Sequence, residues 1–137
     1  MNKQRIARIV KEIDRYAVDL EALGVKKSQD LKDTEKFYAT SMVLFSMVNQ
    51  AINLGEEIVS AKKLGFPESY REVFTLLEDN GIIDDQLRKE FSHLIHFRNL
   101  AAHEYHTFTA EDVYEAYNRI KAVNRFITAI KKELKEQ

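Results

Sequence analysis

The apolar residues of this 137-residue chain recur at helical spacing over most of its length. Between residues 2 and 23 they fall three or four positions apart, which places them on one face of an amphipathic helix. These residues are Ile6, Ile9, Val10, Ile13, Ala17 and Leu20. Gly24 follows, and glycine in this position commonly ends a helix. The polar residues 25–33 predict a connection.

A second, longer helix is predicted from Asp33 to Leu64, and it carries two apolar stripes. One stripe consists of Ser41, Leu44, Val48, Ala51, Gly55 and Ile58, and the other of Tyr38, Met42, Phe45 and Ile52. Together they are broader than one bundle core requires. The surplus predicts a surface for a partner, such as a dimer interface. Gly65 can end this helix, and Pro67 prevents its continuation.

Capping signals divide the rest of the chain into three more helices. Each predicted start has a side chain that can accept a hydrogen bond from the free backbone N–H groups of a first turn. The starts are Ser69 with Glu72 for a short third helix, Asp84 or Asp85 for a fourth, and Thr109 with Asp112 for a fifth. We therefore expect an all-α fold: an up-and-down bundle of four main helices and one short helix, in a single domain over residues 1–137.

Composition agrees with a helical protein and narrows its setting. The chain has one proline and four glycines, while 45% of its residues are hydrophobic and 31% are charged. It has no cysteine, which excludes disulfides and thiolate metal sites and fits a cytoplasmic protein. No apolar run is long enough to span a bilayer, and no signal-peptide segment is evident, so we expect no membrane association.

The net charge of −1 argues against a strongly basic nucleic-acid binder, although the charge is uneven. Residues 1–16 hold five basic and two acidic residues, and residues 119–137 hold six basic and two acidic ones. Solvated helix faces are the favoured interpretation of these ends, ahead of a binding patch.

All four histidines lie in the stretch "HLIHFRNLAAHEYHTF", residues 93–108. If the fourth helix continues through Tyr105, about 100° of rotation per residue sorts its side chains into two sets. Phe91, Leu94, Arg98, Ala102 and Tyr105 fall on or near one face, and Ser92, His96, Asn99 and His103 form a polar stripe beside it. Arg98 thus lies on an apolar face. Because a guanidinium stays protonated, it must meet a carboxylate, lie at a wet interface or await a phosphate.

The residues alone leave three interpretations of this stretch open. The first, which composition favours, is a structural interface arginine with surface histidines. The second is a metal site built from the pairs His93/His96 and His103/His106. It is the least favoured, because the first pair diverges by about 60° and no cysteine or carboxylate completes the ligand set. The third is acid–base chemistry on a phosphodiester, with histidine carrying protons and arginine holding the anion.

The segment "RNLAAHEY", Arg98 to Tyr105, matches the Arg-x4-His-x-Tyr motif of the HepT-like toxins in the HEPN superfamily. Residues 67–105 resemble the most characteristic stretch of that family, and the similarity extends more loosely over the rest of the chain. The resemblance implies a HEPN-type helical bundle that acts as a metal-independent endoribonuclease without a cofactor. It also implies a homodimer in which the motif residues of both subunits face each other across a cleft.

Carried over by position, the resemblance makes Arg98 and His103 the catalytic pair and Asn99 a supporting residue. Tyr105 would be the hydroxyl that receives AMP from ATP, although an aromatic residue packed at a helix end would look the same. The implied partners are RNA (tRNA or mRNA) and an MntA-like nucleotidyltransferase antitoxin, in a type VII toxin–antitoxin pair. His96, one turn before Asn99, is a further candidate for the cleft, and a surface position for it is equally compatible.

The chemistry of RNA is consistent with this assignment, because RNA carries its own nucleophile, the 2′-OH. His103 can act as base or acid near neutral pH. Arg98 can bind the non-bridging phosphate oxygens with two parallel hydrogen bonds, which lysine cannot match. The expected products are a 2′,3′-cyclic phosphate and a 5′-OH. The alternatives are a non-enzymatic helical subunit that binds a nucleotidyltransferase or presents its substrate, and a purely structural helical dimer.

Overall fold

The computed structural model of the chain describes residues 2–103 and 107–136, and within these two ranges it contains helices and no strands. The elements are α1 (Lys3–Ala22), the 3-10 segment η1 (Ser28–Lys32), α2 (Thr34–Ala61), α3 (Tyr70–Asp79), α4 (Asp85–His103), α5 (Ala110–Arg119) and α6 (Lys121–Lys135). The predicted all-α class is confirmed.

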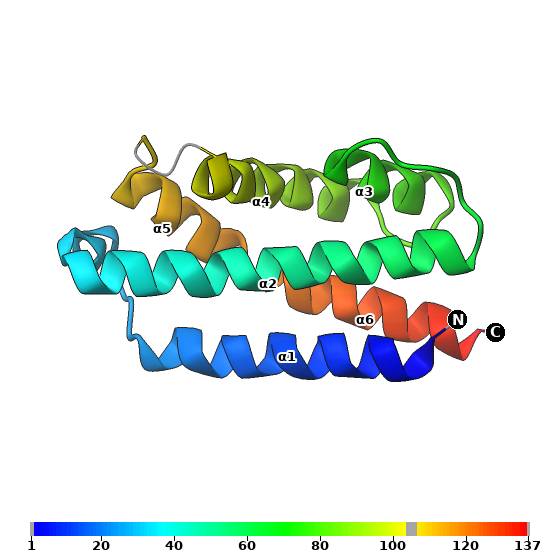
Figure 1. Cartoon of the computed structure of the whole chain (residues 1–137), viewed down its shortest axis with the longest axis horizontal. Helices are drawn as coiled ribbons and strands as arrows, with labels where there is room; N and C mark the ends of the chain where they lie inside the picture. The colour runs from blue at the N-terminus through cyan, green and yellow to red at the C-terminus, as the bar shows by residue number, and fades with distance from the viewer. Residues whose placement is uncertain (1, 104–106, 137) are drawn as a thin grey trace.

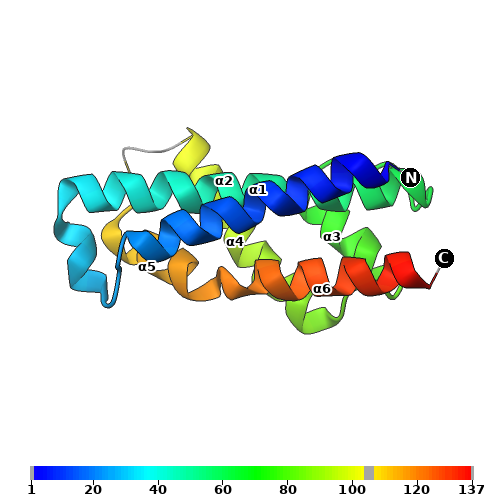
Figure 2. The ribbon, with the colours of Figure 1, turned by 90° about the horizontal axis from the view of Figure 1, so that it is seen from below.

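Helix α2 runs through the whole length of the bundle and is its central element (Figure 1). Helix α1 lies along one side of α2, and α3 and α4 lie along the other. Seen from below, α6 runs beside α1 toward the end of the molecule where the chain starts (Figure 2). The successive elements α1, α2, α4 and α5–α6 alternate in direction, which is the up-and-down arrangement expected for short connections.

The predicted helix starts are formed by the expected side chains. Backbone N–H groups of the first turn donate to Asp33 (from Lys36, 2.9 Å), Ser69 (from Glu72, 3.1 Å), Asp84 (from Leu87, 2.8 Å) and Thr109 (from Asp112, 3.2 Å). Asp112 also accepts from the Thr109 N–H at 2.9 Å, so the capping box of α5 is complete. Glu72 departs from that pattern, because its carboxylate accepts from the Glu68 N–H at 3.1 Å. Gly24 and Gly81 adopt the positive φ angles of +67° and +73° that suit glycine at a helix end.

The connection between α1 and α2 is more ordered than its polar sequence predicts. It contains η1, and the side chains of Val25 and Leu31 are buried. Asp30 accepts hydrogen bonds from the backbone N–H groups of Lys26 (2.8 Å) and Lys27 (3.1 Å), and these bonds lower the pKa of its carboxyl group. The two apolar residues therefore pack this segment against the bundle, and the carboxylate holds the turn of the segment itself.

The last predicted helix is interrupted at Ile120, where α5 ends and α6 begins. The Ile120 N–H donates to the Tyr117 carbonyl at 3.4 Å, and the Val123 N–H donates to the Ile120 carbonyl at 3.0 Å. Both bonds span three residues, which is the tighter spacing of a 3-10 turn. No glycine or proline marks the position in the sequence. The interruption lets α5 pack against η1 and α4 while α6 packs against α2 and α4.

Three phenylalanine rings from different helices form the centre of the core. The ring of Phe91 on α4 stacks on Phe74 of α3 with 4.3 Å between centroids, and Phe126 of α6 lies 5.1 Å from Phe91. These contacts fix the first half of α4 and thereby the direction in which its second half presents polar residues. None of the helices in the described ranges combines the length and apolar character needed to cross a membrane.

Candidate functional site

Arg98 lies in the second half of α4 and is partly buried against α2. Its Nε donates to the side-chain oxygen of Asn49 on α2 at 2.9 Å. Its Nη1 donates to the side-chain oxygen of Asn99 at 3.1 Å. The arginine on the apolar face therefore has hydrogen-bonding partners, as its burial requires, and both of them are neutral amides.

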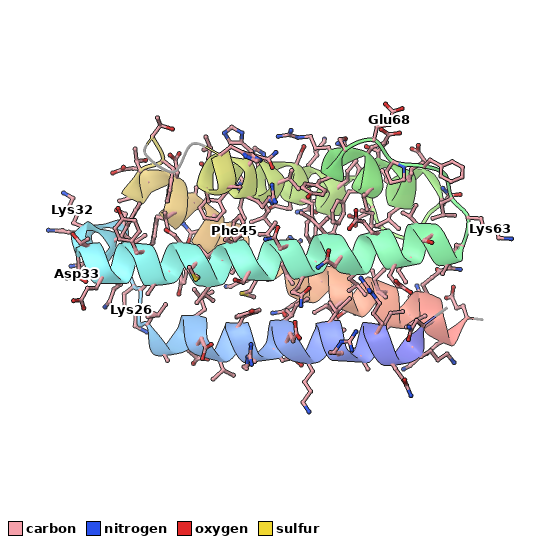
Figure 3. The ribbon with its side chains drawn as sticks, viewed as in Figure 1. Lys26, Lys32, Asp33, Phe45, Lys63 and Glu68 are labelled. Carbon is pink, nitrogen blue, oxygen red and sulfur yellow. The ribbon has the colours of Figure 1, made fainter. Side chains whose placement is uncertain are left out.

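Two aromatic rings complete the surroundings of this guanidinium. Its Cζ lies 4.8 Å from the centroid of Tyr70, the first residue of α3, and 5.4 Å from the centroid of Phe45 on α2. Figure 3 shows Phe45 at the middle of α2. A cation within about 6 Å of an aromatic centroid is attracted to the ring. Side chains from α2, α3 and α4 thus hold Arg98 in one place, and we call Phe45, Asn49, Tyr70, Arg98 and Asn99 the arginine cluster.

Within the described ranges, nothing neutralises the positive charge of the arginine cluster. Among the residues that the structure describes, no carboxylate lies within ion-pair distance of Arg98. Amide oxygens and ring faces orient a guanidinium without cancelling its charge. The guanidinium has five N–H donors, and the recorded bonds use one at Nε and one at Nη1. The cluster is therefore prepared to bind an anion, and the planar donor pattern suits a phosphate.

His103 is the last described residue of α4, and its side chain is exposed. It follows Asn99 by four positions, so the two side chains are neighbours on one flank of the helix. Arg98 is five positions away, which corresponds to about 7.5 Å along the axis and about 140° around it. Asn99, which bonds to Arg98 and stands one turn before His103, lies between the two predicted catalytic residues.

His96 is placed differently from Asn99. It lines a small hollow between α4 and α5 together with His93, Glu115 and Arg119. Nδ1 of His93 lies 4.0 Å from a carboxylate oxygen of Glu115 on α5. The structure thus brings Asn99 to Arg98, while it sets His96 against α5, beside a different group of charged residues.

Tyr105 and His106 lie outside the described residues, so the predicted continuation of α4 through Tyr105 is described only as far as His103. Within residues 2–103 and 107–136, no three histidine, aspartate or glutamate side chains gather as a metal site would need. Of the two histidine pairs in the metal interpretation, His103/His106 is only half described.

Sequence reasoning did not place Asn49, Tyr70 or Phe45 beside Arg98, although it assigned Phe45 to an apolar stripe of the second helix. A signal for Asn49 was present, because it continues the stripe of Tyr38, Met42 and Phe45 at helical spacing. A polar residue inside an apolar stripe requires a partner when it is buried. Nothing in the sequence indicated that this partner is Arg98, 49 positions away.

The fold and the site together define a class: an all-α bundle in which a partly buried arginine is held by two asparagine side chains and two aromatic rings. The chain belongs to the family described as "Ribonuclease HepT-like", whose sequence profile matches residues 6–130. The predicted membership in the HepT-like group is thereby confirmed.

Individual relatives agree with this family. Over 83 residues the chain is 30% identical to the mRNA nuclease HepT of Shewanella oneidensis; the match covers 60% of this chain and 62% of that protein, less than two thirds of its length. The chain also resembles a tri-AMPylated HEPN toxin of Shewanella oneidensis in complex with MNT antitoxin (25% identity, TM-score 0.85, 96% of this chain and 99% of that chain). A chain of a toxin–antitoxin crystal structure with AMP-PNP shares the fold at 23% identity (TM-score 0.87, 95% of this chain and 99% of that chain).

Proposed function

We propose that this protein is a metal-independent endoribonuclease and the toxin of a type VII pair with a nucleotidyltransferase antitoxin. The observation that carries the proposal is the arginine cluster, in which Arg98 is oriented by two neutral amides and keeps its charge. His103 stands one turn beyond Asn99 on the same helix. The nuclease and toxin–antitoxin relatives support the same reading.

In the proposed reaction, Arg98 binds the non-bridging oxygens of the scissile phosphate. A histidine removes the proton of the 2′-OH, which attacks the phosphorus as the P–O5′ bond breaks. A second proton carrier supplies the proton to the leaving 5′-oxygen. The products are a 2′,3′-cyclic phosphate and a 5′-OH, and the charge that develops on the phosphorane is stabilised by the guanidinium.

The angular separation of Arg98 and His103 on α4 favours a site shared between two copies. Tyr38 and Met42 are exposed over 61% and 69% of their surfaces, and their stripe on α2 leads through Phe45 to Asn49. We propose that this stripe is the homodimer interface. Ile52, the fourth predicted member of that stripe, instead belongs to the core of the single chain. A second copy packed there brings a second arginine cluster and a second His103 to one cleft.

The activity is tested by incubating purified protein with tRNA or mRNA in EDTA. Wild type is expected to cleave, while Arg98→Ala and His103→Ala lose about 10²-fold or more of the rate, as expected for a positioned acid–base group or anion clamp. His93→Ala is the matched control, since it removes an exposed histidine of the same helix outside the cluster. Undiminished cleavage by His103→Ala would overturn the mechanism. Absence of cleavage by wild type on all RNAs would favour the non-enzymatic subunit.

We further propose that Tyr105 is the acceptor of AMP from the partner nucleotidyltransferase. An attached AMP would add bulk and negative charge two positions after His103 in the sequence, and its phosphate would compete with RNA for Arg98. Treatment with the partner enzyme and ATP is expected to add the mass of AMP to wild type and not to Tyr105→Phe, and to reduce RNA cleavage by wild type. Mass spectrometry that finds the same modification on Tyr105→Phe would contradict the assignment.

A further inference from the structure

We propose that a hollow beside the arginine cluster is a subsite for a guanine base of the bound RNA strand. In this subsite the Glu56 carboxylate recognises the base by hydrogen bonds. The inference rests on the proposed function, because it extends the site that binds the scissile phosphate. It assigns a role to a part of the molecule that the phosphate chemistry does not use.

The hollow has a volume of about 440 Å³ and lies between the second half of α2, the loop that leads into α3, and α4. Its walls include Glu56, Pro67, Ser69, Tyr70, Arg71 and Asn99. Figure 1 shows this loop passing from the end of α2 to α3 on the side of the bundle that carries α4. Ligand pockets for small molecules begin at about 300 Å³, so one nucleobase can be accommodated.

Two residues belong both to the hollow and to the arginine cluster. Asn99 forms part of the wall and accepts a hydrogen bond from Arg98 at 3.1 Å. Tyr70 forms another part of the wall, and its ring centroid lies 4.8 Å from the guanidinium carbon. Glu56 follows Asn49 by seven positions, which places it on the same face of α2, about 10 Å farther along. A strand whose phosphate rests on Arg98 therefore has an adjoining space for a neighbouring base.

The walls of the hollow offer two contacts that suit a single RNA strand. Tyr70 supplies an aromatic ring, and stacking on such rings binds bases of any sequence. Arg71 supplies a second cation, which suits a further phosphate of the same strand. Neither contact distinguishes one base from another, so discrimination depends on the remaining polar groups.

Glu56 provides the discriminating contact. Its side chain is exposed, and within the described part of the chain no ion pair is recorded for it, whereas the adjacent Glu57 pairs with Arg5 at 3.3 Å. An ionised carboxylate only accepts hydrogen bonds, and it accepts two parallel ones most strongly. Guanine offers two adjacent donors, N1–H and the 2-amino group, and no other RNA base offers this pair on one edge. Glu68 also borders the hollow, but Figure 3 shows it projecting outward from the loop.

The test measures binding of short single-stranded oligonucleotides that differ in one central base and carry 2′-deoxyriboses, so that they cannot be cleaved. At one fixed salt concentration, wild type is expected to bind the guanine oligomer about tenfold tighter than those with adenine, cytosine or uracil. Hypoxanthine, which lacks the 2-amino group, is expected to fall between them. Glu56→Gln should remove the preference. Glu35→Gln, a matched loss of an exposed carboxylate on α2, should preserve it.

Further variants separate base reading from strand binding. Arg71→Ala is expected to weaken binding of all oligomers by a similar factor, because phosphate contacts carry no sequence information. Equal affinity of wild type for all four bases, or an unchanged guanine preference in Glu56→Gln, would overturn the inference. Since no cleavage is needed, these outcomes are distinct from those of the proposed function. RNA that is cut without base preference would contradict only the subsite, and guanine-selective binding without any cleavage would contradict only the ribonuclease.

Discussion

Asn49 is the residue that most changes the picture of the site, because it ties the predicted catalytic arginine to a helix far away in the sequence. Its amide oxygen accepts a hydrogen bond from Nε of Arg98, so the two outer nitrogens of the guanidinium can bind Asn99 and a ligand. A carboxylate in this position would hold the arginine equally well, but it would cancel the charge that a phosphate requires. The neutral amide orients the guanidinium of Arg98 and leaves its positive charge available to a phosphate.

Asn49→Ala is expected to lower the cleavage rate at saturating RNA about tenfold or more, because a partly buried guanidinium loses an acceptor worth about 1–3 kcal/mol and is no longer fixed. Asn49→Asp should retain the geometry but weaken RNA binding, since the added charge neutralises Arg98. Asn53→Ala, one turn farther on α2, is the control, because Asn53 bonds to Gln50 and not to the arginine. Steady-state kinetics and RNA affinity, measured side by side, check this; equal effects of the Asn49→Ala and Asn53→Ala changes would refute the positioning role.

The sequence pattern located Arg98 on an apolar face and Asn99 beside it, and both positions follow from helical rotation alone. It could not supply Asn49 or Tyr70, because contacts between helices depend on how the helices pack. A pattern of three or four residues specifies a face of one helix and carries no information about which residue of another helix meets it. The same limit applies to His96. The sequence left open whether it faces the cleft or the surface, and the packing of α5 on α4 places it beside α5.

At the scale of elements, helix starts were predictable, and so were the ends at Gly24 and Gly81, because capping is a local interaction between nearby residues. The predicted end of the second helix at Leu64 was wrong: α2 ends at Ala61, and Lys63 rather than Gly65 takes up the left-handed turn, with φ at +54°.

The interruption at Ile120 was not predictable, since the stripe of Val113, Ile120 and Ile127 continues through it without a glycine or proline. All three of these side chains are buried. An apolar stripe therefore stays intact across a 3-10 turn, and periodicity alone does not reveal the turn.

Helices α2 and α3 approach each other closely at Gly55, and this approach brings Tyr70 toward Arg98. A Cβ atom at Gly55 would lie 2.9 Å from Cγ1 of Val73, which is itself fully buried. Gly55→Val is therefore expected to lower the free energy of unfolding by about 1–3 kcal/mol, because overpacking exceeds the small gain in helix propensity.

Thermal or denaturant unfolding measures the effect of Gly55→Val. Ser60→Val is the matched control, because Ser60 is exposed on the same helix and its replacement should change stability by less than about 0.5 kcal/mol. A variant at Gly55 that is as stable as wild type would show that α3 can shift away from α2 without loss.

At the scale of the whole molecule, one long helix connects the core, the exposed stripe and the site. Tyr38 and Met42 of the stripe are exposed to solvent in the single chain, while the opposite face of α2 is buried. The breadth of the apolar surface indicated a partner surface from sequence alone. The sequence could not reveal that this surface adjoins Arg98, because the two come together only when α4 packs on α2.

Met42→Glu is expected to convert a dimer of twice the 16.0 kDa chain mass into a monomer, because it places a charge in the middle of the proposed interface. Cleavage of RNA should fall with it, since the shared cleft is lost. Val18→Glu is the control: Val18 is 68% exposed on α1, so this variant should remain dimeric and active. Sedimentation or light scattering measures both, and a fully dimeric Met42→Glu protein would place the interface elsewhere.

The continuity of the α2 stripe with the arginine cluster has a further consequence for how the activity depends on concentration. When two chains must associate to complete one cleft, RNA that binds across both chains also stabilises the pair, because any ligand of the assembled state shifts the equilibrium toward it. At protein concentrations below the dimer dissociation constant, the rate then rises with the square of the concentration. If the proposed dimer forms the cleft, a few copies of the chain are expected to cleave little RNA, and cleavage is expected to rise steeply as the chain accumulates.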